Sequence, residues 1–197
     1  MISSFLAELA QPRPDPGGGA AAAYGGMLAL ALLAKVVQLE AQRPGNQGER
    51  QVWEKQLEQV QQLTADLDRL REEDVKAYAQ MVAARASGSQ GQGWQEAVEY
   101  ALKVPREIMD RAREALILLA WAGARCRKHL VSDLLVALEF LRAVLRGAHH
   151  IARANLPLVA EESRYQEFSR QLVEAEESGR QAYREARAIL AAQGCVK

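Results

Sequence analysis

Apolar residues recur every three or four positions along most of the chain, with charged residues and glutamines between them. The clearest stripe lies in residues 49–86 and consists of Trp53, Leu57, Val60, Leu63, Leu67, Leu70, Tyr78 and Met81. This spacing places the side chains on one face of a helix. No segment alternates Val, Ile and Thr with the two-residue period of a strand. The pattern therefore predicts an all-α protein built from long amphipathic helices.

Clusters of proline and glycine divide the pattern into helices with short connections. Besides residues 49–86, the pattern predicts helices over residues 3–10 and 18–43, from Trp94 onward, from near Ser132 as an N-cap, and from Pro157 to Gly194. Pro105 marks a kink or a new helix start. Turns are predicted at residues 11–16, 44–48 and 87–93. Because nothing reads as a repeat or a second domain, we expect residues 1–197 to form a single antiparallel bundle around one central apolar helix.

That central helix, residues 18–43, is apolar on nearly every face between Ala20 and Leu33. A membrane-spanning helix needs about 20 such residues, and this run ends sooner, before Lys35. We therefore expect a buried helix and no membrane span. A monomeric bundle leaves part of such a helix uncovered, so we also expect a homodimer.

Composition narrows the classes of function. The 25 Lys and Arg residues balance the 25 Asp and Glu residues, so the formal net charge is zero. This balance argues against a nucleic-acid partner and against an anionic membrane surface. The two cysteines, Cys126 and Cys195, are far apart and lack metal-ligand spacing. They imply no disulfide framework and favour a reducing, cytoplasmic location.

The glycine turn, Gly17-Gly18-Gly19, opens the central helix directly after a proline-rich segment. Residues without a Cβ let the backbone approach a ligand closely, and the free N–H groups of a helix start favour an anion. The phosphate-binding and dinucleotide-binding fingerprints are both absent. The turn is therefore a candidate ligand-binding segment that does not belong to those nucleotide-binding classes.

Two acidic residues stand out from the pattern. Asp74 falls on the apolar stripe between Leu70 and Tyr78, where a carboxylate is costly unless it is paired or used, and where burial suits it to acid–base work. Alternatively, it pairs with an internal arginine or caps another helix. Asp133 follows Ser132 at the start of a helix that is apolar on two faces. It either faces a pocket or belongs to a plain N-cap.

The helix that starts near Ser132 also carries one polar stripe, formed by Glu139, Arg142, Arg146, His149, His150 and Arg153. This stripe is either solvated surface or a basic patch for an anionic ligand tail. Neighbouring histidines project about 100° apart on a helix, and no further ligands stand at zinc spacing. No metal site is predicted.

Together these residues resemble the cyclodeaminase/cyclohydrolase family of folate enzymes, which includes the cyclodeaminase domain of formiminotransferase-cyclodeaminase and stand-alone methenyltetrahydrofolate cyclohydrolases. The order and spacing of the motifs hold over nearly the whole chain, and the Pro-x-Pro-Gly-Gly-Gly helix start is the most specific. The motifs are Phe5-Leu6, Pro14 to Gly19, Glu73-Asp74 with Ala77-Tyr78, Val104-Pro105, Ser132-Asp133 with Ala137, Gly147-Ala148 and Asn155-Leu156.

The resemblance implies an all-helical homodimer that takes a tetrahydrofolate derivative as substrate and binds no other cofactor. Asp74 and Asp133 are then the acid–base candidates. The glycine turn would hold a carboxylate or a pterin edge, and the basic stripe would hold the glutamyl tail. The candidate substrate-binding residues are Gly17, Gly18, Gly19, Tyr78, Ser132, Arg146, His150 and Asn155.

Two hypotheses about function follow. The first is an enzyme that hydrolyses methenyltetrahydrofolate or cyclises formiminotetrahydrofolate with loss of ammonia. Both reactions pass through a tetrahedral carbon between two nitrogens and need only orientation and proton transfer. The second is a diverged, non-catalytic binding or assembly module, because Ala20, Ala124 and Ile151 stand where the family usually has Ser or Asn.

Overall fold

The structure, a computed structural model, describes residues 4–45, 48–88 and 91–195, and within these ranges it contains helices and no strand. The predicted all-α fold is confirmed. The predicted helix start at Ser3 and parts of two predicted turns, residues 46–47 and 89–90, lie outside the described residues. The long helices are α2 (Gly18–Ala41), α3 (Arg50–Ala86), α4 (Gln92–Gly123), α5 (Val131–Asn155) and α6 (Glu162–Leu190). The short elements are α1 (Ser4–Leu9), two 3-10 turns at Lys128–Leu130 and Leu156–Leu158, and a π-helical segment at Ala191–Cys195.

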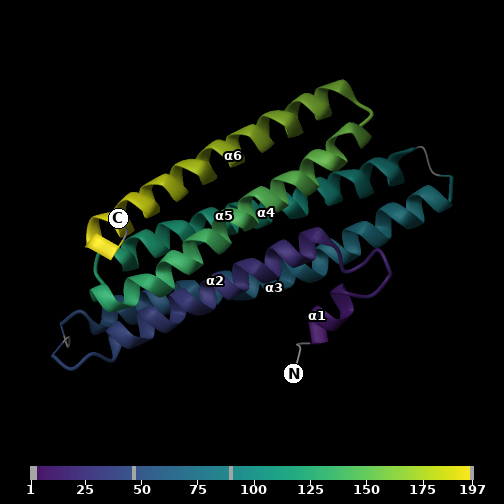
Figure 1. The fold of residues 1–197 in the computed structure, drawn as a ribbon. Helices are drawn as coiled ribbons and strands as arrows, with labels where there is room; N and C mark the ends of the chain where they lie inside the picture. Colours follow the sequence, from purple (N-terminus) through teal and green to yellow (C-terminus); the bar gives the residue numbers. More distant parts are fainter. Residues whose placement is uncertain (1–3, 46–47, 89–90, 196–197) are drawn as a thin grey trace.

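The long helices lie side by side along one direction and reverse at short connections (Figure 1). α2 packs against α3 and α5, and α4 packs against α3, α5 and α6. One continuous apolar cluster fills the space between them and includes Leu30, Leu67, Leu116 and Leu138. The chain is therefore the antiparallel bundle that its apolar stripes predict.

Small residues on α2 let its neighbours come close. A Cβ placed on Gly26 would lie 2.7 Å from Cδ1 of Leu67 on α3, and a Cβ placed on Gly147 of α5 would lie 3.6 Å from the Cβ of Ala22. Judged by length and composition alone, α2 is also long and apolar enough to cross a membrane. In the bundle one side of α2 is buried against α3 and α5, whereas Leu28 on its other side is exposed.

Two predicted boundaries are wrong, and one of two alternatives for Pro105 is excluded. Pro105 begins no new helix, because α4 runs through it and buries it in the core. Ser132 is exposed and is not an N-cap, since α5 already begins at Val131 without a side-chain cap. Pro157 does not open α6, because it lies in a 3-10 turn and α6 begins at Glu162.

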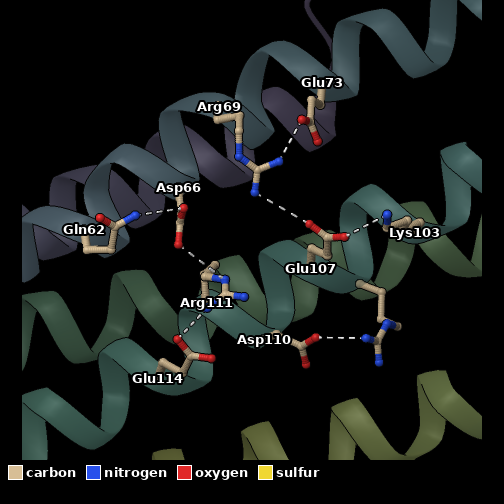
Figure 2. Close-up of polar contacts among 10 residues, drawn as sticks. Gln62, Asp66, Arg69, Glu73, Lys103, Glu107, Asp110, Arg111 and Glu114 are labelled. Carbon is tan, nitrogen blue, oxygen red and sulfur yellow. Dashed lines mark hydrogen bonds and ion pairs between the residues drawn. The ribbon is translucent and has the colours of Figure 1, made fainter. Parts of the chain in front are cut away.

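Ion pairs join α3 to α4 along their solvent side (Figure 2). Arg69 lies 2.7 Å from Glu73 on its own helix and 3.8 Å from Glu107 on α4. Arg111 of α4 in turn lies 2.7 Å from Glu114 and 3.8 Å from Asp66 of α3. Pairs of this kind contribute little individually, and here they connect α3 and α4 at the edge of their apolar contact.

A buried ion pair holds the far end of α2. Glu40 is 1% exposed, and its Oε1 accepts hydrogen bonds from the backbone N–H of Arg127 at 3.1 Å and from its Nε at 2.8 Å. Burial alone raises the pKa of Glu40, but the hydrogen bonds and charge of Arg127 outweigh burial and leave that pKa below its ordinary value. The pair therefore attaches the loop after α4 to α2.

We expect Arg127→Ala to lower the free energy of unfolding by roughly 1–3 kcal/mol at pH 7, because the buried carboxylate loses its guanidinium hydrogen bond. Among these contacts it keeps only the backbone N–H of residue 127 and the more distant Arg43 at 3.5 Å. The partial exposure of Arg127 (39%) keeps the loss below that of a fully buried pair. Since the pKa of Glu40 is lowered in the folded state, the stabilisation is present above pH 4.5 and disappears as the pH falls through the folded pKa. Urea unfolding of wild type and variant at several pH values measures this difference.

The matched control is Arg164→Ala, which breaks an exposed pair with Glu99 and should cost less than about 1 kcal/mol. Equal losses in the two variants would contradict a special role for the buried pair.

Candidate functional site

A cavity of about 260 Å³ lies where the start of α2 meets the C-terminal part of α3 and the end of α5. The glycine turn forms one wall, α3 a second and α5 a third, while Ala101 of α4 closes the back. The sequence-predicted residues that line it are Gly17, Gly18, Gly19, Asp74, Tyr78 and Asn155. Segments far apart in the chain thus converge on one concave site, to which we refer as the glycine-turn cavity.

Asp74 joins two walls of this cavity. Its Oδ2 accepts a hydrogen bond from the backbone N–H of Ala20 at 2.8 Å, so a carboxylate on α3 satisfies one of the free N–H groups at the start of α2. Of the alternatives for this residue, helix capping is the one present, and it occurs inside a cavity. Asp74 is therefore both a structural cap and an acid that lines the cavity.

Burial raises the pKa of Asp74, and the hydrogen bond from Ala20 offsets only part of that effect. The carboxyl group thus keeps a proton at higher pH than an ordinary aspartate. A raised pKa together with a place in a cavity is the combination expected of a proton donor or acceptor.

Gly19 is the residue of the glycine turn that has no room for a side chain. A Cβ there would lie 2.5 Å from Cγ of Asp74, whereas a Cβ on Gly18 would meet Cδ1 of Ile151 at 3.2 Å and one on Gly17 would meet the carbonyl oxygen of Pro14 at 3.4 Å. The three glycines therefore differ in role. Gly19 admits the Asp74 carboxylate, while Gly17 and Gly18 leave backbone open to the cavity.

Polar and apolar groups divide the rest of the lining. The side-chain Nδ2 of Asn155 donates to the carbonyl oxygen of Ala101 at 3.0 Å, which fixes the amide and leaves its Oδ1 as an acceptor. Tyr78 is 39% exposed, and Met81 continues the same stripe beside it. The apolar stripe of α3 therefore packs in the core as far as Leu70, and beyond it Tyr78 and Met81 line the cavity.

The structure does not bring Asp133 and Ser132 to this cavity. Asp133 lies two residues into α5, whereas Asn155 ends that helix, so about 33 Å of helix separates them at 1.5 Å per residue. Oδ2 of Asp133 is 2.8 Å from Nζ of Lys35 on α2. Within one chain, the two predicted acids cannot act on the same atom.

Arg146 and His150 lie on a different side of α5 and line a second cavity, of about 480 Å³, between α5 and α6. Within the part of the chain that the structure describes, no three His, Cys, Asp or Glu side chains are grouped so that they could hold a metal ion.

Several lining residues were not among those singled out in the sequence, namely Val75, Ala101 and Ala154. These apolar residues gave no signal because helix periodicity marks them only as core. Of the three departures from the family, Ile151 lines the cavity and Ala20 is fully buried beside Asp74. Ala124 lies at the end of α4, away from the cavity.

Comparison with known proteins gives a consistent result. The sequence profile described as formiminotransferase-cyclodeaminase matches residues 1–174. The fold matches the crystal structure of formiminotetrahydrofolate cyclodeaminase from Thermotoga maritima with a TM-score of 0.89 and 23% sequence identity, over 98% of this chain and 96% of that chain. No significant match exists among curated protein sequences.

We expect Gly19→Ala to disturb the cavity more than Gly18→Ala does. The new Cβ at residue 19 forces the Asp74 carboxylate away from the Ala20 N–H, which should lower the free energy of unfolding by roughly 1–3 kcal/mol. At residue 18 only the end of a flexible isoleucine must shift, so the loss should stay below about 1 kcal/mol. Thermal or urea unfolding compares the two, and equal losses would contradict the role assigned to Gly19.

Proposed function

The chain belongs to the formiminotransferase-cyclodeaminase family, and from this premise we propose that it acts as a folate enzyme on the carbon between N5 and N10 of tetrahydrofolate. The reaction that we propose is cyclisation of formiminotetrahydrofolate with loss of ammonia, the activity named for the Thermotoga maritima protein that has the same fold. The single observation that carries the proposal is the Asp74 carboxyl group, which lies in the glycine-turn cavity with a raised pKa beside open backbone.

The proposed reaction needs one well-placed acid. N10 attacks the formimino carbon and forms a tetrahedral carbon bonded to N5, N10 and the former imino nitrogen. The C–N bond to that nitrogen then breaks, and ammonia leaves with the N10 proton and one proton from an acid, so that methenyltetrahydrofolate forms. In this proposal the protonated Asp74 carboxyl gives its proton to the imino nitrogen, then takes the proton from N10 and passes it to the leaving nitrogen. Solvent afterwards reprotonates the carboxylate.

The cavity suits one end of a folate. Its volume of about 260 Å³ is just under the roughly 300–1,000 Å³ of sites that enclose a whole drug-sized ligand. The reacting pterin end would occupy it, with its apolar edge against Met81 and Ile151 and its polar edge at Asn155 and the glycine turn. The remainder of the folate would extend past Tyr78 toward solvent.

One assay tests the proposed reaction and two alternative functions. In the first alternative, hydrolysis of methenyltetrahydrofolate, water adds to the same carbon at the position that the formimino nitrogen occupies in the cyclisation, and the same acid transfers the proton. A non-catalytic binding module is supported by Ala20 and Ile151, which are apolar at or beside the cavity. Incubation with each folate, followed by methenyl absorbance and ammonia release, distinguishes the three: ammonia release supports the proposal, hydrolysis alone replaces it with the cyclohydrolase, and no turnover leaves the binding module.

We expect Asp74→Asn to lower kcat by about 10²–10⁴-fold, because the amide cannot transfer the proton. Its side-chain oxygen can still accept the Ala20 hydrogen bond. The raised pKa of Asp74 means that its ionised form is disfavoured in the folded state above pH 3.8. At pH 7 the variant should therefore be as stable as the wild type or more so, as urea unfolding would show.

Asp68→Asn is the control, since Asp68 is an exposed acid on the same helix, paired with Arg71. It should leave turnover and stability nearly unchanged. Wild-type turnover in Asp74→Asn would remove Asp74 from the mechanism, and a large loss of stability would show that the charge itself is needed at the helix start.

We also propose that the protein is a homodimer, and that its contact surface is a face formed by α2 and α5. Leu28 of α2 and Val136 and Phe140 of α5 are exposed apolar side chains. They lie along one α2–α5 face that extends from the neutralised Lys35–Asp133 pair toward the glycine-turn cavity. A second copy is the occupant that we propose, because a twofold contact with antiparallel α5 helices would cover both apolar faces. It would also bring Asp133 of the partner subunit toward this cavity, which is the arrangement in which Asp133 could be catalytic.

We expect the wild type to sediment as a dimer and Phe140→Arg to sediment as the 21.7 kDa chain, because a buried unpaired charge opposes association. If Asp133 of the partner subunit completes the site, the variant should also lose turnover. Val173→Arg, a similarly exposed apolar residue on α6, should change neither property. A monomeric wild type would refute the dimer, and an active monomeric variant would refute the shared site.

A further inference from the structure

We infer that the protein has a second ligand site, a basic cavity between α5 and α6 that binds a small anion with several closely spaced negative charges. The site is separate from the glycine-turn cavity, and the inference does not depend on the proposed folate reaction.

The basic cavity, of about 480 Å³, combines charge with an apolar floor. Five arginines from two facing helices surround it, namely Arg142, Arg146, Arg153, Arg180 and Arg184. Met109 of α4 and Leu145 of α5 form the floor, and Glu176 is the one acidic residue of the lining. A chain with no net charge thus concentrates positive charge in one hollow.

Most of this charge is not neutralised by the protein. Arg142 lies 3.5 Å from Glu139. Within the described residues, by contrast, Arg146, Arg153, Arg180 and Arg184 have no carboxylate within 4.0 Å. On the α3–α4 surface the arginines drawn in Figure 2 each lie beside a carboxylate. Among the described residues, Arg85, Arg113, Arg125 and Arg187 also lack a carboxylate within 4.0 Å. What distinguishes Arg146, Arg153, Arg180 and Arg184 is that all four line one cavity.

The chemistry of the arginines defines the ligand. A guanidinium group presents parallel N–H donors that match the oxygens of phosphate or carboxylate groups. Guanidinium groups that converge from two helices repel one another until an anion lies between them. A single monovalent anion would neutralise only part of the charge, so the site favours an anion with two or more adjacent charged groups.

His149 adds a neutral wall to the basic cavity. Its Nδ1 is buried without a hydrogen-bond partner, and its Nε2 lies 3.8 Å from Glu176. Burial lowers the pKa of His149, and Arg153 and His150 lower it further, against the opposite effect of Glu176. At neutral pH the arginines therefore carry the charge of the site.

The two cavities share no lining residue. On α5 the glycine-turn cavity is lined by Ile151, Ala154 and Asn155, and the basic cavity by Arg142, Leu145, Arg146, His149, His150 and Arg153. At about 100° per residue, the centres of these two sets are roughly half a turn apart, and the sets adjoin only at His150 and Ala154, which are one turn apart. We therefore assign the basic cavity to a separate anion.

Calorimetric titration of the full chain with inorganic tripolyphosphate tests the site. We expect saturable binding that weakens as salt is added. The Arg146→Ala/Arg180→Ala double variant should bind at least about tenfold more weakly, because two charge-assisted contacts are lost. The control, Arg50→Ala/Arg170→Ala, removes the same charge from exposed ion pairs and should stay within about twofold of wild type.

A γ-linked oligoglutamate peptide, titrated in parallel, distinguishes a carboxylate chain from a phosphate chain as the source of the charge. Saturable binding of either anion that depends on Arg146 and Arg180 supports the site. If the control variant binds equally weakly, the binding reflects general surface charge and the specific site is refuted. If neither anion shows saturable binding, the site is also refuted. Gly18→Val should leave the affinity unchanged, and a loss there would overturn the separation of the two cavities. Circular dichroism confirms that each variant is folded.

Discussion

The hydrogen bond between Asp74 and the backbone N–H of Ala20 is the contact on which the glycine-turn cavity depends. It joins the middle of one helix to the first turn of another, and it requires Gly19, because any side chain there would occupy the space of the carboxylate. Burial raises the pKa of the Asp74 carboxyl, and the hydrogen bond from Ala20 offsets part of that effect. One interaction therefore caps a helix and joins two walls of the cavity.

The rest of the bundle supports this arrangement from a distance. At the far end of α2, Glu40 and Arg127 attach the loop that follows α4. Ion pairs between side chains of α3 and α4 connect these two helices along their solvent side (Figure 2). Small residues let α2 lie close to both neighbours, and close packing limits how far the start of α2 can move relative to Asp74. The position of the acid is thus a property of the whole bundle.

Charge is distributed unevenly in a chain that is neutral as a whole. Several arginines are paired with acids three or four residues away, a geometry that helix periodicity alone creates. Of the arginines of α5 and α6 that line the basic cavity, Arg142 has such a partner, whereas Arg146, Arg153, Arg180 and Arg184 have none among the described residues. Polar stripes that look alike in sequence can therefore form either neutral surface or a basic cavity. The difference is whether the neighbouring helix contributes acids or further arginines to the contact.

The sequence by itself determined the helices, the all-α bundle and the family, because periodicity, helix breakers and a specific motif are local properties of the chain. It did not determine that Asp74 would cap the helix after the glycine turn, that Asp133 would lie about 33 Å of helix away beside Lys35, or that Arg146 and His150 would face α6. It also left open whether a helix continues through Pro105, and it missed that Ser132 caps none. Those outcomes depend on which helix packs against which and in which direction, and that choice is made by the summed burial of the whole core, which no single stripe records.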